Sequence, residues 1–146
     1  MEQERIDKRI IAFIKKHHVL TLATAAEGAP YCSNLFYTYL EEKNVFVFTS
    51  SENTRHAAEM KNDGRVAGSV VLETEIVGKI QGLQFQGIVL KPEGELLKAA
   101  RTAYLKRFPF AVFMDVELWV LELTFAKLTD NRLGFGRKLV WERDKK

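Results

Sequence analysis

The chain has 146 residues and a mass of 16.7 kDa, the size of one domain. With 47% hydrophobic and 28% charged residues it has the composition of a folded globular protein, and no apolar run approaches the ~18 residues of a membrane span. The single cysteine, Cys32, excludes an intramolecular disulfide and a cysteine-based zinc cluster, and the acidic start without an apolar core predicts a cytoplasmic protein.

The net charge of +3 is unevenly distributed along the chain. Residues 132–146 hold six cations and two anions, a net of +4, which leaves −1 for residues 1–131. Nucleic-acid binding needs a broad cluster of cations that contact phosphates, and a short basic tail does not supply it. We therefore expect no nucleic-acid partner.

The first half of the chain begins with an amphipathic pattern, in which apolar residues recur at helical spacing and the pair His17-His18 follows. The run from Val45 to Phe48 is apolar at every position, which predicts a strand buried on both faces. Gly64 is expected to end a helix in a left-handed conformation. The elements predicted here are a helix over 5–17, strands over 19–24, 31–40 and 45–49, and a helix over 54–62.

The second half predicts longer strands around one further helix. Gly87 marks a bulge or a close approach of two backbones. Alternation places Trp119, Leu121, Leu123 and Phe125 on one face of a strand. The predicted elements are strands over 65–72, 79–90, 118–125 and 138–143, and a helix with Pro92 at its first position that stops before Pro109.

These elements favour a mainly β (α+β) fold as a single domain over residues 1–146. Consecutive strands with short turns predict antiparallel pairing, and many short strands favour a closed barrel with flanking helices. A doubly wound sheet is excluded because helices do not alternate with the strands. Cys32, in the middle of a strand, is expected to be a small packed side chain.

The segment 49–56, with the sequence TSSENTRH, runs from the end of a strand into the start of a helix. Free backbone N–H groups at a helix start favour an anion, whereas the cation Arg55 is unfavourable beside the positive end of the helix dipole. A bound phosphate would remove this conflict and accept a forked pair of hydrogen bonds from Arg55.

A structural interpretation of the same segment stays open. In it, Thr54 or Asn53 caps the helix and Arg55 pairs with Glu52 or Glu59, without a ligand. Elsewhere the chain has no G-x-S-x-G nucleophile motif and no carboxylate pair spaced for glycoside chemistry. We therefore name no catalytic residue and expect no metal site.

The order of these segments resembles the FMN-binding split barrels related to pyridoxamine-phosphate oxidase. The layout matches from residue 6 to about residue 91, and the end of the chain resembles a narrower bacterial branch, the YhbP-like proteins. The motifs are PYCSNLFYT at 30–38, VFVFTS at 45–50, TRHA at 54–57, RVA at 65–67, the segment 82–87, RFP at 107–109, TDNRLGFG at 129–136 and WER at 141–143.

The resemblance implies a six-stranded antiparallel barrel, a homodimer, and FMN at the dimer interface. It places the FMN phosphate at residues 49–56 and the isoalloxazine ring along strand residues 33–38, with Asn34 and Phe36 as contacts. The strand at 81–82 would also reach the flavin. The implied cofactor-binding residues are Ser33, Asn34, Phe36, Thr38, Thr49, Ser50, Arg55, His56, Gln81 and Gly82.

Some positions depart from the oxidase pattern. His56 stands where the oxidases often have Lys, and the spacing from Thr49 to Arg55 is one residue longer. Ser33 and Thr38 replace an Arg and a Lys at the ends of the flavin strand. Because that Lys helps to hold the substrate phosphate, we expect no pyridoxamine-phosphate oxidase activity.

The leading expectation is an FMN-dependent oxidoreductase that acts on an unidentified small molecule, in which the protein positions the cofactor and excludes water. A second hypothesis is a non-catalytic module that holds flavin or haem as a carrier or sensor. A third is a barrel that has lost its cofactor and serves in protein interaction. The apolar strands 31–40 and 45–49 offer more apolar surface than one barrel needs, which also favours the dimer.

Overall fold

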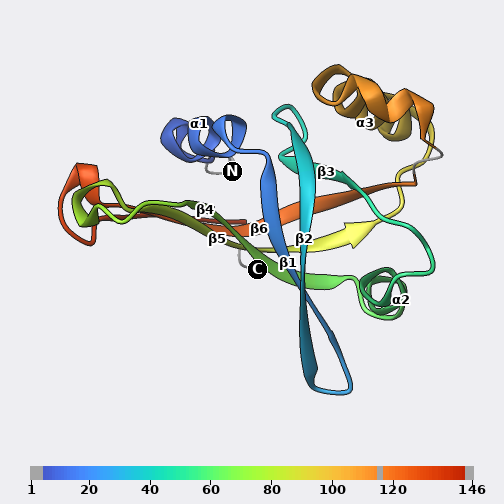
Figure 1. The fold of residues 1–146 in the computed structure, drawn as a ribbon, viewed down its shortest axis with the longest axis horizontal. Helices are drawn as coiled ribbons and strands as arrows, with labels where there is room; N and C mark the ends of the chain where they lie inside the picture. Colours follow the sequence, from blue (N-terminus) through green and yellow to red (C-terminus); the bar gives the residue numbers. More distant parts are fainter. Residues whose placement is uncertain (1–4, 115–116, 144–146) are drawn as a thin grey trace.

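Six antiparallel strands close into a barrel in the computed structural model of the protein, which describes residues 5–114 and 117–143 (Figure 1). Their hydrogen-bonded order is β3-β2-β1-β4-β5-β6, and a β3–β6 pairing completes the ring. This confirms the predicted split barrel. The strands are β1 (Val19–Ala26), β2 (Ala29–Leu40), β3 (Val45–Thr49), β4 (Arg65–Leu72), β5 (Gln81–Leu90) and β6 (Leu118–Asp130).

Strand β6 changes partner along its length, and this splits the barrel. Its first half pairs with β3, from Leu118 to Glu122. Its second half instead pairs with a seventh strand, β7 (Lys138–Glu142). The long β5–β6 pair therefore extends beyond the closed ring as a ribbon, toward the left of Figure 1.

Within the described residues, three helices and three short 3-10 helices, η1 to η3, complete the fold. Helices α1 and α2 bury apolar side chains in the cluster that fills the barrel interior, whereas α3 packs outside the barrel on β2, β3 and β6. Among the described residues, no helix is long and apolar enough to cross a membrane. The bounds are α1 (Lys8–Lys16), α2 (Arg55–Asn62), α3 (Gly94–Arg107), η1 (Val77–Lys79), η2 (Pro109–Phe113) and η3 (Asn131–Leu133).

Strand β3 is buried on both faces, as its apolar run predicted. Phe46 and Phe48 lie in the interior cluster, and Val45 and Val47 pack with residues of α3. The expectation that 45–49 offers apolar surface to a second copy is therefore wrong, because α3 covers it.

The bulge expected at Gly87 is present, and it changes the face of β6. The β5–β6 register skips one β6 residue, Thr124, between Gln86 and Gly87. A Cβ atom on Gly87 would lie 2.4 Å from the carbonyl oxygen of Glu122, so the backbones also approach closely. An inserted residue reverses the alternation. Phe125 therefore leaves the inner face, contrary to the prediction.

Two predicted helix boundaries also differ. Gly64 does not adopt a left-handed conformation; its carbonyl accepts a hydrogen bond from the Val89 N–H at 2.8 Å, and a Cβ atom there would lie 2.9 Å from the Val89 oxygen. A close approach of strands therefore accounts for this glycine. Pro92 precedes the helix cap Glu93, and α3 begins at Gly94 with a φ of +57°.

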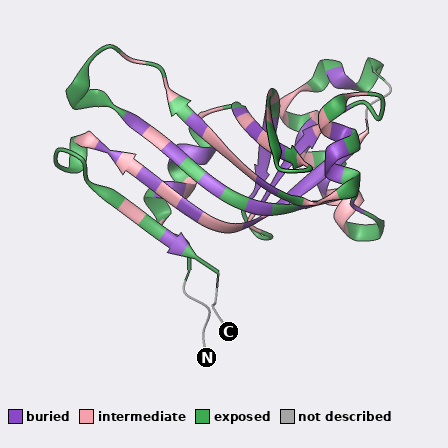
Figure 2. Ribbon diagram, turned by 90° about the horizontal axis from the view of Figure 1, so that it is seen from below, coloured by how far each residue is buried: buried purple, intermediate pink, exposed green. Residues whose placement is uncertain are grey.

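The centre of the outer face of β1, β2, β4 and β5 carries no charged side chains. Buried and exposed positions alternate along the sheet (Figure 2), and Cys32 is exposed, so its predicted packing is wrong. A shallow hollow of about 420 Å³ lies on this face. None of its lining residues is charged: Thr21, Ala23, Cys32, Ala67, Gly68, Ser69, Gln84, Phe85, Gln86 and Phe125.

Candidate functional site

Polar side chains converge where β3 leads into α2, in a region that we call the β3–α2 corner (residues 49–59). Thr54 caps α2, since its Oγ1 accepts from the Ala57 N–H at 3.3 Å. Ser50 is 7% exposed, and its hydroxyl contacts Nε2 of His56 and lies 3.3 Å from the Thr54 hydroxyl. A serine, a threonine and a histidine thus meet at the first turn of the helix.

The neighbouring hydroxyl, Thr49, does not join this cluster. Its Oγ1 lies 3.3 Å from the Tyr104 hydroxyl of α3, on the opposite side of β3 from Ser50.

Burial lowers the pKa of His56, and the Glu59 charge opposes this shift only in part. The imidazole is therefore neutral at pH 7 and still able to gain a proton beside an anion.

Arg55 makes two contacts with its surroundings. Its Nε donates to Oε1 of Glu59 at 3.1 Å, and its guanidinium carbon lies 4.1 Å from the centre of the Tyr31 ring. Glu52, the other partner considered, pairs instead with Lys61 and Lys91. The contacts of the structural interpretation are thus present.

Those contacts leave Arg55 with donors to spare. Its side chain is 56% exposed, and among the described residues no group accepts a hydrogen bond from its two terminal nitrogens. Thr54 caps the N–H of Ala57, whereas the backbone N–H groups of Arg55 and His56 have no acceptor among the described residues. The corner therefore presents unused donors of the kind that bind an oxyanion.

Strand β2 divides its predicted site residues between its two faces. Asn34 and Phe36 lie on the outer face, where Asn34 accepts a hydrogen bond from Thr21 at 2.8 Å and Phe36 is 53% exposed. Thr38 is 7% exposed and pairs with Val47, which α3 covers. Ser33 faces the other way, and its buried hydroxyl has no hydrogen-bond partner among the described residues.

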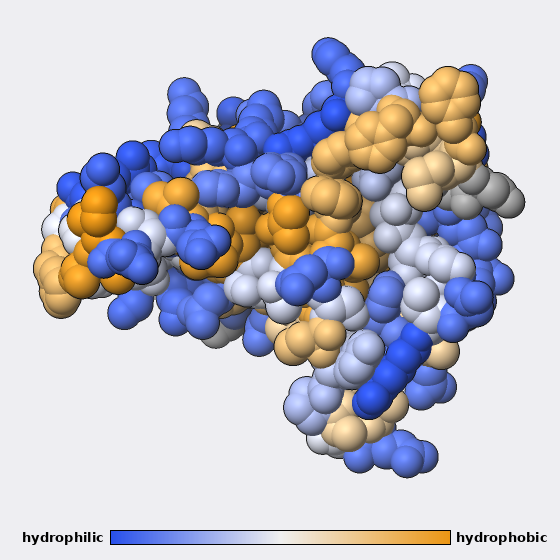
Figure 3. All heavy atoms as spheres, viewed as in Figure 1, coloured by the Kyte–Doolittle hydropathy of each residue, from blue (hydrophilic) through white to orange (hydrophobic). Residues whose placement is uncertain are grey.

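Phe36 belongs to an exposed aromatic cluster that the sequence analysis missed. Its ring stacks on His18 at 6.1 Å and meets Phe108 at 5.6 Å. The sequence signal for this cluster is the aromatic segment that follows α3, with Phe108, Phe110 and Phe113. Hydrophobic side chains gather near α3 in Figure 3, and η2 and its neighbour contribute Phe110, Val112, Phe113 and Met114, each at least 60% exposed.

Gln81 and Gly82 lie apart from these groups within one chain. Strands β2 and β5 are separated by β1 and β4, hence by roughly 14 Å along the sheet. The register aligns Asn34 with Gln84 through Thr21 and Ser69, so Gln81 lies a further ~10 Å along its strand. The corner and the middle of β2, by contrast, adjoin, because Tyr37 pairs with Phe48 near the end of β3.

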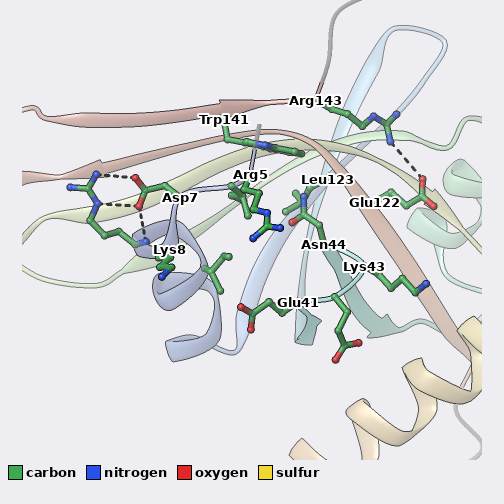
Figure 4. A pocket seen from close by; sticks show the side chains of 14 residues that line it. Arg5, Asp7, Lys8, Glu41, Lys43, Asn44, Glu122, Leu123, Trp141 and Arg143 are labelled. Carbon is green, nitrogen blue, oxygen red and sulfur yellow. Dashed lines mark hydrogen bonds and ion pairs between the residues drawn. The ribbon is translucent and has the colours of Figure 1, made fainter. Parts of the chain in front are cut away.

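A larger hollow of about 1150 Å³, the α1 cleft, lies between α1, the β2–β3 loop and the end of β7 (Figure 4). None of the predicted site residues lines it. Its wall carries both signs of charge, with Arg143 3.9 Å from Glu122 and Arg9 2.9 Å from Asp7. Among the described residues, no cluster of His, Cys, Asp and Glu could hold a metal ion, here or elsewhere.

Comparison with known sequences finds a family over most of the chain. The family described as "Pyridoxamine 5'-phosphate oxidase" matches residues 6–130. A UPF0306 protein of Photorhabdus laumondii is 38% identical over 131 residues, which are 90% of this chain and 92% of that protein. The UPF0306 protein YhbP of Escherichia coli (strain E2348/69) is 40% identical over 134 residues, 92% of this chain and 96% of the relative.

Solved structures with the same fold include cofactor-binding proteins. A haem-binding protein from Mycobacterium smegmatis superposes with a TM-score of 0.76 at 25% identity, over 95% of this chain and 59% of that longer protein. A FAD-binding protein from Mesorhizobium loti has a TM-score of 0.69 at 15% identity, over 88% of this chain and 97% of its own. The second likeness shows the fold alone.

Proposed function

Since the chain belongs to the pyridoxamine 5'-phosphate oxidase family and to its UPF0306 branch, we propose that it is an FMN-binding flavoprotein that acts as a homodimeric oxidoreductase on a small molecule. The observation that carries this proposal is the β3–α2 corner. Its unused donors, namely the helix start and the terminal nitrogens of Arg55, suit a phosphate monoester. The hydrogen-bonded pair of Ser50 and His56 lies beside them.

Two carboxylates, Glu52 and Glu59, lie at the corner, and both are paired with cations. Glu59, the carboxylate nearest to Arg55, is paired with it, and Glu52 is paired with two lysines. Neither carboxylate is therefore left unpaired to repel a phosphate. The residues present fit the group, and bound FMN would supply the redox chemistry.

The ring of the flavin is assigned to the outer face of β2. Asn34 and Phe36 lie there, Phe36 precedes Tyr37, which pairs with Phe48 near the corner, and the exposed Phe36 ring offers a stacking surface. Thr38 is covered by α3 and carries no charge, so it does not hold a substrate phosphate. This supports our expectation that the protein lacks pyridoxamine-phosphate oxidase activity.

A second copy would complete the site. Gln81 and Gly82 are remote from the corner of their own chain, so they reach a flavin only if they come from a partner. The uncharged hollow at the centre of the outer face suits such a pairing, because charged residues are depleted at the centre of protein interfaces. The layout of the proposed site therefore supports the proposed dimer.

Titration of flavin-stripped protein tests the proposal. We expect one FMN per chain, quenched flavin fluorescence, riboflavin bound at least about 10-fold more weakly, and sedimentation as a dimer. Bleaching of the bound flavin by NADH or NADPH, followed by reoxidation with an electron acceptor, would identify an enzyme rather than a carrier. Equal affinity for FMN and riboflavin, or sedimentation at 16.7 kDa only, would contradict it.

A haem-binding module is the second candidate function. It is favoured by the exposed His18, which stacks on Phe36, together with the 25%-identical haem-binding structure. An exposed imidazole beside an aromatic surface is a suitable haem ligand. Titration with haemin should then give a shifted Soret band that His18→Ala abolishes, and unchanged haemin spectra in the wild-type protein would reject this candidate.

A further inference from the structure

Arg55 lies over a cradle formed by two neighbouring strands. Thr24 of β1 and Tyr31 of β2 are directly paired in the β1–β2 register, so their side chains share one face. Arg55 and Glu59 are one helical turn apart on α2. The Tyr31 ring lies under the Arg55 guanidinium, and the Thr24 hydroxyl donates to the Glu59 carboxylate.

Each contact fixes a different property of the Arg55 side chain. The ring of Tyr31, 4.1 Å from the guanidinium carbon, sets the plane of the guanidinium. Glu59, which is 8% exposed, accepts from Nε and sets its direction. The Thr24 hydrogen bond and Arg55 both lower the pKa of Glu59, so this partner stays ionised.

We propose that Tyr31 is a positioning residue for phosphate recognition: its ring, together with Glu59, holds Arg55 so that the two terminal guanidinium nitrogens are presented to the FMN phosphate. An arginine that is already held loses less conformational freedom when the phosphate binds. The inference rests on the proposed FMN function, and it assigns a role to a strand residue outside the predicted cofactor-binding set.

The test compares FMN with riboflavin on flavin-stripped protein by calorimetry. Tyr31→Leu removes the ring face without changing any charge, and it should weaken FMN about 3- to 10-fold while riboflavin changes less than about 2-fold. Tyr31→Phe keeps the face and should restore the wild-type ratio, because the Tyr31 hydroxyl has no hydrogen bond among the described residues. The ratio of the two affinities is insensitive to a loss of folded protein.

A double-mutant cycle separates positioning from direct contact. If Tyr31 acts through Arg55, Tyr31→Leu should have no effect on FMN affinity in an Arg55→Ala background. A persisting effect there would mean that Tyr31 contacts the flavin itself, which would overturn the inference.

The remaining outcomes are distinguishable from failure of the proposed function. Should Arg55→Ala lower the FMN-to-riboflavin ratio while Tyr31→Leu does not, the phosphate site stands and the positioning role of Tyr31 is wrong. Should Arg55→Ala itself leave the ratio unchanged, both the phosphate site and this inference are wrong. Phe36→Ala is the matched control, because it removes an aromatic side chain of β2 at the ring end of the site and should weaken both flavins alike.

Discussion

The β3–α2 corner and the α1 cleft differ in how their charges are arranged. The cleft is the larger of the two hollows. At its wall, Arg9 pairs with Asp7, which lies two residues away along the chain. In the corner, side chains from β1, β2 and α2 meet, and they leave the terminal nitrogens of Arg55 without an acceptor among the described residues. This difference in how Arg55 is held is the reason why we propose the corner, and not the larger cleft, as the ligand site.

Removal of Arg55 should have the largest effect. Arg55→Ala is expected to weaken FMN about 10- to 100-fold and riboflavin hardly at all, because it deletes a charge-assisted pair to phosphate. Arg55→Lys should restore part of the affinity, since lysine lacks the fork. Lys43→Ala in the α1 cleft should leave FMN affinity unchanged; a comparable loss there would place the phosphate in the cleft.

Stability alone does not discriminate between the two interpretations of Arg55. Its partner Glu59 is 8% exposed, so loss of the pair leaves a largely buried carboxylate uncompensated and should lower the melting temperature in either case. The ratio of FMN to riboflavin affinity is therefore the measurement that decides.

Phe36→Ala should have the next largest effect. We expect both flavins to bind about 5- to 20-fold more weakly, because a stacking surface is lost. Since Phe36 is 53% exposed, its removal should cost less than about 1.5 kcal/mol of stability, well below the loss from a buried phenylalanine. Calorimetry and thermal unfolding of the apoprotein measure both quantities. A large loss of stability with unchanged flavin affinity would count against the site.

Mild acid should affect the corner before the cleft. Burial lowers the pKa of His56 below its usual 6.5, so the unfolded chain binds the proton more readily and stability falls as the pH drops through and below 6.5. In the cleft, the hydrogen bonds from Arg9 lower the pKa of Asp7 to about 2, so this group does not titrate there. The melting temperature of the apoprotein should decline between pH 7 and 5, and less steeply in His56→Gln.

The smallest effect is expected in the wall of the α1 cleft. Arg9→Ala removes an exposed pair with Asp7 and should shift the melting temperature by no more than about 2 °C. Thermal unfolding beside Arg55→Ala gives the comparison. A larger shift for Arg9→Ala than for Arg55→Ala would reverse our ranking of the two regions.

Local pattern predicted most of the strands, but it did not predict their faces everywhere. The apolar run of β3 fits only a strand between two layers, and it was placed correctly. The bulge at Gly87 was predicted. Its effect on Phe125 was not, because that effect depends on which β6 residue is skipped when β5 and β6 pair. Cys32 was predicted to be packed but is exposed. In its strand, apolar side chains occur at both odd and even positions, so the sequence does not show which face is covered.

The candidate site depended on contacts between distant segments. The sequence left Glu52 and Glu59 as equal partners for Arg55, and Lys91, 39 residues from Glu52, decides between them by pairing with Glu52. The cap at Thr54 is local and was among the predicted alternatives. The contact between Arg55 and the Tyr31 ring forms only because the β1–β2 hairpin packs against α2. The spacing of residues in the sequence does not predict that packing.

The β1–β4 pairing is the narrowest seam of the barrel. It consists of three residue pairs, from Thr21–Ser69 to Ala23–Ala67, whereas β5 and β6 share ten. Local opening costs least where the fewest pairs must separate, so backbone amides along this seam should exchange with solvent earliest among those of the barrel. Its residues Thr21, Ala23, Ala67 and Ser69 line the uncharged hollow of the outer face. A second copy bound to this face would cover the β1–β4 pairing and slow amide exchange along it.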